Sequence, residues 1–165
     1  MHPNEALITR LYTCFQARDA AGMKECYQPD AVFSDPVFGR LEGEQVTAMW
    51  AMLCARAADL EIAFSGVSAD AETGRAHWDA HYTFSQTGRK VFNQIDAAFG
   101  FRDGLIARHD DQFSFARWSR QALGPVGALL GWTPMLRARV GAGARKGLAA
   151  YMRKAAERNA DGGTG

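Results

Sequence analysis

The sequence predicts one α+β domain, in which short N-terminal helices pack in the concave face of a curved antiparallel sheet and leave a cone-shaped pocket. Apolar residues recur at helical spacing up to about residue 58, alternate with period two from Asp59 to Phe115, and then return to helical spacing. With 165 residues, 47% of them hydrophobic and 22% charged, the chain can bury one sizeable core. We expect a cone-shaped body over residues 1–115, a C-terminal helical extension over 116–158 and a disordered tail over 159–165.

The first part of the chain carries three predicted helices and one short strand. The first helix has Asn4 as its expected N-cap and one apolar stripe, made of Leu7, Ile8, Leu11, Tyr12 and Phe15. Asp19 is placed to cap a second, shorter helix, and a third helix should follow Gly43. Between them, Ala31–Asp35 reads as an extended segment that ends at Pro36, because proline cannot donate to a strand ladder.

Four strands are predicted after residue 58, joined by turns rich in glycine and polar residues. Their expected ranges are Leu60–Ser68, Arg75–Ser85, Lys90–Phe101 and Leu105–Phe115. The last turn contains Asp103-Gly104, a strong signal for a two-residue hairpin. Three consecutive hairpins would form an antiparallel meander.

Alternation within these strands separates an inner from an outer face. On the second strand, the aromatic face contains Trp78, Ala80, Tyr82 and Phe84, and the opposite face contains His77, Asp79, His81 and Thr83. On the last strand, the inward set is either Ala107, His109, Asp111 and Phe113 or the alternating set Ile106, Arg108, Asp110 and Gln112. Both sets contain ionisable groups, so a buried or half-buried charge is expected in either case.

The C-terminal extension reads as helical and basic. Thr133-Pro134 fits an N-cap followed by proline at the first helical position. Three glycines inside the final helix weaken it, so it should depend on tertiary contact. We expect the extension to cover either the pocket mouth or the partner subunit, because it carries six large apolar residues: Trp118, Leu123, Leu129, Leu130, Trp132 and Met135.

Charge and motifs exclude several classes of function. Residues 116–165 hold 9 Lys and Arg against 2 acidic residues, yet few aromatics accompany them, which argues against nucleic-acid binding. No run of about 18 apolar residues predicts a membrane span, and no signal peptide is recognisable. Cys14, Cys26 and Cys54 form no C-x-x-C pair and indicate free thiols in the cytoplasm. His77, Asp79 and His81 could face one metal ion, but a triad on one strand is weak support, so we expect neither a metal nor a cofactor.

Three segments make the chain resemble the SnoaL-like and ketosteroid-isomerase-like branch of the nuclear transport factor 2-like superfamily. They are residues 17–23, residues 27–39, which contain Asp35-Pro36-Val37-Phe38-Gly39, and residues 99–106. The resemblance covers roughly residues 5–115 and implies the cone-shaped fold. It also implies a small-molecule pocket. Because relatives dimerise through the outer face of the sheet, the resemblance implies a homodimer as well.

The resemblance assigns the role of general base to Asp35. The tyrosine that stabilises the oxyanion in the isomerases falls on Leu11, one position before Tyr12, and the second oxyanion donor falls near Ala97. Because both donor positions hold apolar residues, the resemblance argues against a true ketosteroid isomerase. The Asp–Arg–Asp relay of the epoxide-hydrolase relatives also lacks a clear arginine here.

Two functional hypotheses follow. In the first, the chain is a cofactor-independent isomerase, cyclase or lyase that acts on a small, largely apolar carbonyl compound. Asp35 would be the base, with His109 and Asp111 as its catalytic partners. The ligand would lie against seven pocket residues: Tyr12, Trp50, Trp78, Tyr82, Asn93, Phe99 and Phe113.

In the second hypothesis, the chain is a non-catalytic ligand-binding or assembly module. Asp35 would then only cap the turn before Pro36, and His109 and Asp111 would be a structural hydrogen-bonded pair. Under both hypotheses we expect a small apolar or amphipathic ligand and a homodimer, with no nucleic-acid or membrane partner.

Overall fold

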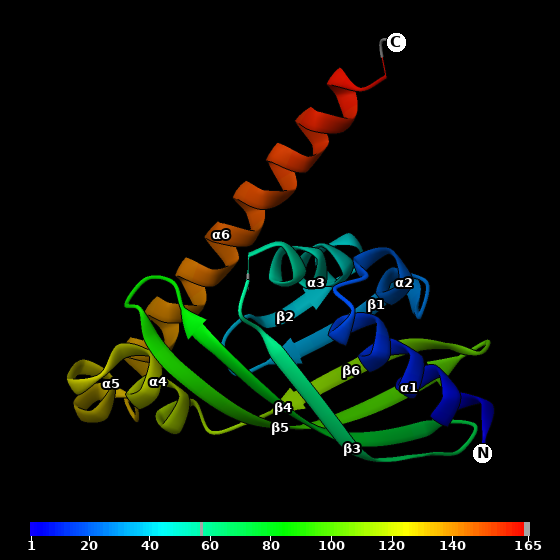
Figure 1. Cartoon of the computed structure of the whole chain (residues 1–165), viewed down its shortest axis with the longest axis horizontal. Helices are drawn as coiled ribbons and strands as arrows, with labels where there is room; N and C mark the ends of the chain where they lie inside the picture. Colours follow the sequence, from blue (N-terminus) through cyan, green and yellow to red (C-terminus); the bar gives the residue numbers. More distant parts are fainter. Residues whose placement is uncertain (57, 164–165) are drawn as a thin grey trace.

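The computed structural model, which describes residues 1–56 and 58–163, has the predicted α+β architecture. Helices α1 (Pro3–Gln16), α2 (Ala20–Lys24) and α3 (Glu44–Arg56) precede most of the sheet in the chain. The strands are β1 (Tyr27–Asp35), β2 (Gly39–Glu42), β3 (Glu61–Ala69), β4 (Thr73–Phe84), β5 (Arg89–Arg102) and β6 (Leu105–Gln112). Figure 1 shows α1 and α3 over one face of this curved sheet.

The sheet has the order β2-β1-β6-β5-β4-β3. Strands β3 to β6 form the predicted antiparallel meander, but β1 pairs with β6 in parallel, with Phe33 opposite His109. The predicted antiparallel sheet therefore contains one parallel junction. A parallel neighbour needs a long crossover, and α3 with the meander supplies it. This pairing brings the end of β1 next to the end of β6.

The sheet curves where its ladders are interrupted. Between β3 and β4 the register shifts between Ser65 and Ser68, at Gly66, whose φ is +63°. A bulge of this kind bends the strand and increases its twist, and glycine adopts the positive φ at little cost. A second shift lies between Gly100 and Phe101, on the β5–β6 ladder.

Helix α1 buries the predicted apolar stripe but begins earlier than expected. Its N-cap is His2, whose imidazole accepts from the Asn4 N–H at 3.1 Å. Asn4 lies inside the helix and donates from its side chain to the Asp70 carbonyl at 2.8 Å. A histidine is a rare N-cap, so the usual cap preferences pointed to the wrong residue. The caps predicted at Asp19 and Thr133 are confirmed.

The outer face of the sheet carries the polar set expected from alternation. His77 is hydrogen-bonded to Asp96 at 2.8 Å and to Asp79 at 2.9 Å, so Asp96 lies on this face. His81 stacks on Phe92 with a centroid separation of 4.2 Å. Within residues 1–56 and 58–163, no three His, Cys, Asp or Glu side chains are grouped so that they could hold a metal ion.

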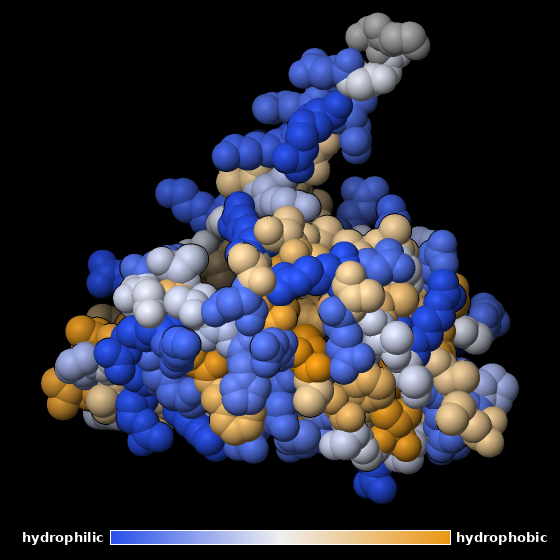
Figure 2. Space-filling model, in the orientation of Figure 1, coloured by the Kyte–Doolittle hydropathy of each residue, from blue (hydrophilic) through white to orange (hydrophobic). Residues whose placement is uncertain are grey.

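The extension forms α4 (Phe115–Leu123), α5 (Pro125–Leu130) and α6 (Pro134–Asp161). Helix α6 extends three residues into the segment 159–165, for which a disordered tail is predicted, and residues 164–165 lie outside the described residues. Leu148 of α6 is buried in the main core beside α3, whereas the end of α6 projects from the body with a hydrophilic surface (Figures 1 and 2). Across the described residues, no helix is both long and apolar enough to span a membrane.

Within this single chain, most of the large apolar residues of the extension do not cover the body, and cover by a partner subunit stays a prediction. Trp118 is buried and Leu123 half-buried, but four others are exposed: Leu129, Leu130, Trp132 and Met135. Helix α5 is short and turns outward after Gly124-Pro125, so only its Gly127 side packs against α4. Hydrophobic side chains consequently reach the surface at the α5 corner (Figure 2).

Candidate functional site

The inner face of the sheet holds a buried hydrogen-bonded chain of three side chains. His109 contacts the Tyr27 hydroxyl through Nδ1 at 2.8 Å and Asp111 Oδ1 through Nε2 at 2.8 Å. An ionised carboxylate only accepts, so Nε2–H donates to Asp111 and Nδ1 accepts from the Tyr27 O–H. A neutral imidazole satisfies both bonds. Burial, and then the charge of Asp111, raises the pKa of Tyr27 well above its usual value, which keeps the hydroxyl as a donor.

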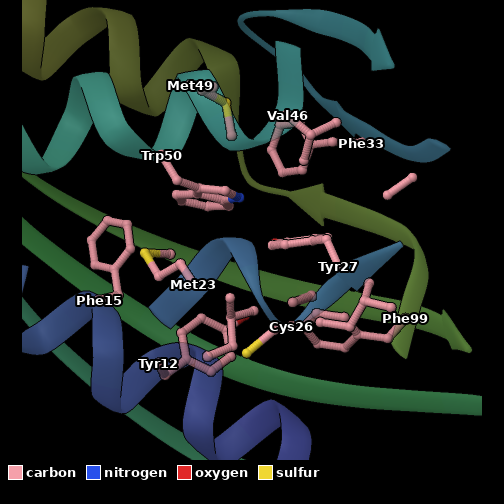
Figure 3. Packing of buried hydrophobic residues seen from close by; sticks show 14 of the residues in the cluster. Tyr12, Phe15, Met23, Cys26, Tyr27, Phe33, Val46, Met49, Trp50 and Phe99 are labelled. Atoms are coloured by element: carbon pink, nitrogen blue, oxygen red, sulfur yellow. The ribbon is translucent and has the colours of Figure 1, made fainter. Parts of the chain in front are cut away.

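Aromatic rings enclose this buried chain. The Trp50 ring stacks on His109 with centroids 5.8 Å apart, and Phe99 lies 4.4 Å from the imidazole on the other strand. Rings from α1, α3 and the sheet point toward one another in the close view of the core (Figure 3). The apolar interior pocket that the sequence predicts is therefore not confirmed, because side chains fill this part of the concavity.

Two polar atoms in this interior lack a hydrogen-bond partner among the described residues. They are the Tyr12 hydroxyl and the Trp50 indole N–H, and both side chains are 2% exposed. Burial and the nearby Asp111 charge raise the pKa of Tyr12 well above its usual value. A buried unpaired donor costs free energy, so these two positions are where an incoming acceptor would gain most.

Asp35 lies at the end of β1, where the interior meets the surface. Its Oδ1 accepts from the Val37 N–H at 2.9 Å and from the Phe38 N–H at 2.6 Å. Burial, with a smaller contribution from the charge of Asp111, raises the pKa of Asp35 to about 7, although the two amides and His109 lower it. The carboxyl group is therefore both a turn cap and a group that titrates near neutral pH.

A groove opens beside Asp35, between the β1–β2 turn and α6. Its volume is about 310 Å³, and nine residues line it: Asp35, Pro36, Val37, Gly39, Pro134, Arg137, Ala138, Gly141 and Arg145. A neighbouring cavity of about 330 Å³ shares Pro134 and Arg137 and is otherwise formed by residues 115–116 and 131–133. The open space near Asp35 is thus walled by the extension.

Helix α4 packs against β5, near the end of the sheet where Asp35 lies. The Trp118 indole N–H donates to the Tyr82 hydroxyl at 2.7 Å. Trp118, Phe115 and Ala122 form a second apolar cluster with Val91, against which Tyr82 and Phe113 also pack. Burial, and then the charge of Asp35, raises the pKa of Tyr82, while the hydrogen bond from Trp118 lowers it.

The structure brings the three predicted catalytic residues to one end of the inner face. His109 and Asp111 are hydrogen-bonded to each other, whereas the hydrogen bonds of Asp35 go to backbone amides. His109 and Asp111 are completely or almost completely buried, and Asp35 is half-buried. Asp111 and His109 influence the pKa of Asp35 only through space. Of the two alternatives for β6, the inward set is the one with His109 and Asp111.

The seven predicted ligand-binding residues separate into three groups. Four are buried core residues: Tyr12, Trp50, Trp78 and Phe99. Tyr82 and Phe113 are half-buried at the junction of the two apolar clusters, and Asn93 is half-buried on the inner face of β5, opposite Ala80. None of the seven lines the groove at Asp35.

Sequence reasoning missed four residues that shape the site. Tyr27 became a partner of His109 only through the parallel β1–β6 pairing, for which the sequence holds no local signal. Arg137 and Arg145 reach the groove because α6 folds back across the β1–β2 turn, and Trp118 was expected as cover but not as a donor to Tyr82. The spacing of Arg137, Gly141 and Arg145 by four, which places them along one side of a helix, was the available signal.

Residues 8–109 match the family model of the SnoaL-like domain, which is more than half of the chain. The chain belongs to the SnoaL-like family. This confirms the resemblance to the nuclear transport factor 2-like superfamily that the sequence motifs suggested. A search of the curated proteins found none that matches the chain.

Solved structures show the same fold at low identity. A candidate SnoaL-like polyketide cyclase from Jannaschia sp. CCS1 is 16% identical, with a TM-score of 0.65 over 74% of this chain and 93% of that chain. IdmH, a candidate polyketide cyclase from Streptomyces antibioticus, is 20% identical, with a TM-score of 0.61 over 73% and 98%. An epoxide hydrolase of the LEH-like type from M. tuberculosis is 16% identical, with a TM-score of 0.62 over 78% and 95%. At these identities the three structures show the shared fold.

Proposed function

We propose that this SnoaL-like chain is a cofactor-independent acid–base catalyst, an isomerase, cyclase or lyase, in which Asp35 is the general base. One observation carries this: a carboxyl group with a pKa of about 7 lies at the wall of an open groove. A base titrating near the working pH combines a useful ionised fraction with a strong driving force for proton transfer. The substrate would be a small carbonyl compound.

The reaction begins when the Asp35 carboxylate removes a proton from the carbon beside the substrate carbonyl, leaving an enolate and a neutral acid. Returning this proton to a different carbon gives an isomerase. Attack of the enolate carbon on a second carbonyl of the same molecule gives a cyclase, in which the new alkoxide takes the proton back from Asp35. Asp111 assists by making the ionised form of Asp35 less favourable, and His109 holds Asp111 in place. In this role His109 and Asp111 support the base.

Deuterium exchange tests this proposal without knowledge of the natural substrate. The probes are 2-tetralone and 3-benzoylpropionate in D₂O, with loss of the proton signal beside the carbonyl followed by NMR. Wild-type protein should accelerate exchange with an apparent pKa near 7, and Asp35→Asn should lose about 100-fold or more of it. Asp30→Asn, an exposed carboxylate on the same strand, should keep full activity. Equal exchange by wild type and Asp35→Asn would reject the role of base.

A non-catalytic ligand-binding or assembly module is the second candidate. It is favoured by the filled interior and by Leu11 and Ala97, both buried and apolar at the positions of the isomerase oxyanion donors. Under this function the protein would bind a small apolar or amphipathic molecule without exchange of its protons. A probe that binds beside Asp35 and exchanges no faster than in buffer would support the module.

We also propose a homodimer in which the outer faces of two sheets meet, in a cytoplasmic protein. The outer face presents His77, Asp79, His81 and Thr83 on a broad and weakly charged surface, and the cysteines are free thiols. Sedimentation at micromolar concentration should give twice the mass of one chain. His81→Glu should weaken the dimer, because it would place two added negative charges in one symmetric interface. A monomer at this concentration would contradict the proposed homodimer.

A further inference from the structure

The groove at Asp35 is flanked by two arginines whose hydrogen bonds go to backbone carbonyls, and Arg137 also lies over the Phe115 ring, with Cζ 5.8 Å from the centroid. Arg137 donates from Nε to the Pro36 carbonyl at 3.3 Å, and Arg145 donates from Nη1 to the Phe38 carbonyl at 3.1 Å. In the part of the chain that the structure describes, no ion pair within 4.0 Å includes either of them. A guanidinium has five N–H donors, so most of those at the groove remain for a ligand.

Close packing of α6 holds these arginines at the groove. Gly141 lies between them, one helical turn from each, and a Cβ there would be 2.8 Å from the Val37 carbonyl and 3.2 Å from Arg145 Nη1. Glycine therefore lets the helix backbone approach the turn that carries Asp35. The lining also includes Pro134, at the N-terminus of the 28-residue helix α6, where the helix dipole favours negative charge.

Among the described residues, the positive charge at the groove forms no ion pair with the acidic residue that lines it. Asp35 is the acidic residue among the lining residues, and its Oδ1 is directed to two backbone amides. Neither arginine is among the main influences on Asp35, which are burial, two amides, Asp111 and His109. Two cations and one carboxyl group at its wall leave the groove suited to a ligand that brings a negative charge of its own.

We propose that Arg137 and Arg145 bind a carboxylate group of the substrate, so that a carbonyl elsewhere in the same molecule lies over Asp35. This specifies the substrate class as a small carboxylated carbonyl compound, and it rests on the proposed function of Asp35. A cavity of about 310 Å³ is at the lower end of the range for ligand pockets, which limits the substrate to a small molecule. Anchoring one end of the substrate at the arginines restricts the orientation of the carbon that loses its proton.

The test compares 3-benzoylpropionate with its neutral amide, 3-benzoylpropionamide, as ligands of the wild-type protein at pH 7.5. The acid should bind at least about tenfold more tightly than the amide, as expected for charge-assisted hydrogen bonds. Its binding should also move the ¹³C resonance of the Asp35 carboxyl group, which locates it at the groove. Equal affinities, or binding that leaves the Asp35 resonance unchanged, would overturn the proposal. This measurement needs no variant and so cannot be confused with misfolding.

Variants then assign the preference to the two arginines. In Arg137→Gln/Arg145→Gln the preference for the acid should fall below about threefold, while glutamine still offers a donor to the backbone carbonyls. Arg139→Gln removes the same charge from an exposed position on α6 outside the groove lining and should keep the full preference. If Arg139→Gln loses as much as the double variant, general charge attraction explains the binding and the site is rejected.

The outcome also separates this proposal from the proposed function. An acid that binds beside Asp35 without exchanging its protons would retain the anion site and reject Asp35 as a base. Exchange of 2-tetralone that depends on Asp35, together with equal binding of acid and amide, would retain the base and reject the anion site.

Discussion

The interior of the sheet and the seam between body and extension, which is the groove at Asp35, each hold a carboxyl group but differ in how far they are closed. In the interior, His109 is completely buried and both of its ring nitrogens are bonded. At the seam, Asp35 is half-buried, arginines reach across to backbone carbonyls, and a groove stays open. The contrast teaches that rigidity and chemical access are supplied by different parts of the fold. Aromatic rings around His109 close the interior, whereas helix α6 crosses the seam and leaves the groove open.

Removing the extension tests this contrast most severely. A chain that ends at Ala116 loses Trp118, Ala122 and Leu148, all buried against the body. We expect the free energy of unfolding to drop by about 4 kcal/mol or more, from about 1.5–3 kcal/mol for each large apolar side chain. Binding of an environment-sensitive dye should rise.

A second truncation, which removes only residues 153–165, supplies the control. Residues 153–163 are mostly exposed on the projecting end of α6, so urea unfolding should match that of the full chain. A long truncation that stays as stable as the full chain and binds no more dye would show that the extension is a passive tail.

Single leucines sharpen the same comparison. Leu148→Ala should cost about 2–5 kcal/mol, because it removes a side chain that is 2% exposed between α6 and α3. Leu129→Ala, on the 72% exposed side chain of α5, should change stability by no more than about 0.5 kcal/mol. Thermal unfolding of both variants measures this difference. A large loss in Leu129→Ala would mean that the α5 corner is covered in solution.

Paired tyrosines probe the interior. Tyr27→Phe leaves His109 Nδ1 without its donor and should destabilise the fold by about 1–3 kcal/mol. Tyr12→Phe removes a hydroxyl that has no partner among the described residues and should be neutral or slightly stabilising. Urea unfolding of the two variants side by side gives the comparison. Equal losses would contradict the assignment of a hydrogen-bonded chain to Tyr27, His109 and Asp111.

The smallest expected effect is the pH dependence at the seam. The pKa of Asp35 rises from 3.8 to about 7 on folding, so the folded state holds its proton more tightly. The resulting stabilisation is complete below pH 3.8 and is lost as the pH rises toward 7. Asp35→Asn keeps an oxygen acceptor for the two amides and cannot ionise, so it should be more stable than wild type by about 1–3 kcal/mol at pH 8.

At pH 4.5 the gain from this substitution should largely disappear. Urea midpoints of wild type and Asp35→Asn at the two pH values measure the difference. Asp30→Asn, whose side chain is 70% exposed, should show no such dependence. A gain that is the same at both pH values would contradict a raised pKa for Asp35.

Local patterns in the sequence determined much of this protein. Alternation over Trp78–Phe84 identified the inner face of β4, and the apolar stripe of the first helix and the turn at Asp103-Gly104 placed their elements correctly. The motif around Asp35-Pro36 identified the family, and the same alternation left His109 and Asp111 as one of two inward choices on β6. These features depend on residues a few positions apart, so they can be recognised from the sequence alone.

Only the tertiary structure decided what surrounds Asp35. The parallel pairing of β1 with β6 brings Tyr27 to His109 across 82 positions of sequence, and α6 brings Arg137 to Pro36 across 101 positions. Whether the concavity is open depends on how the rings of α1 and α3 pack against β4 and β5, which residue type alone does not specify. Such contacts arise from chain topology and from the shapes of several side chains at once, so no local pattern contains them.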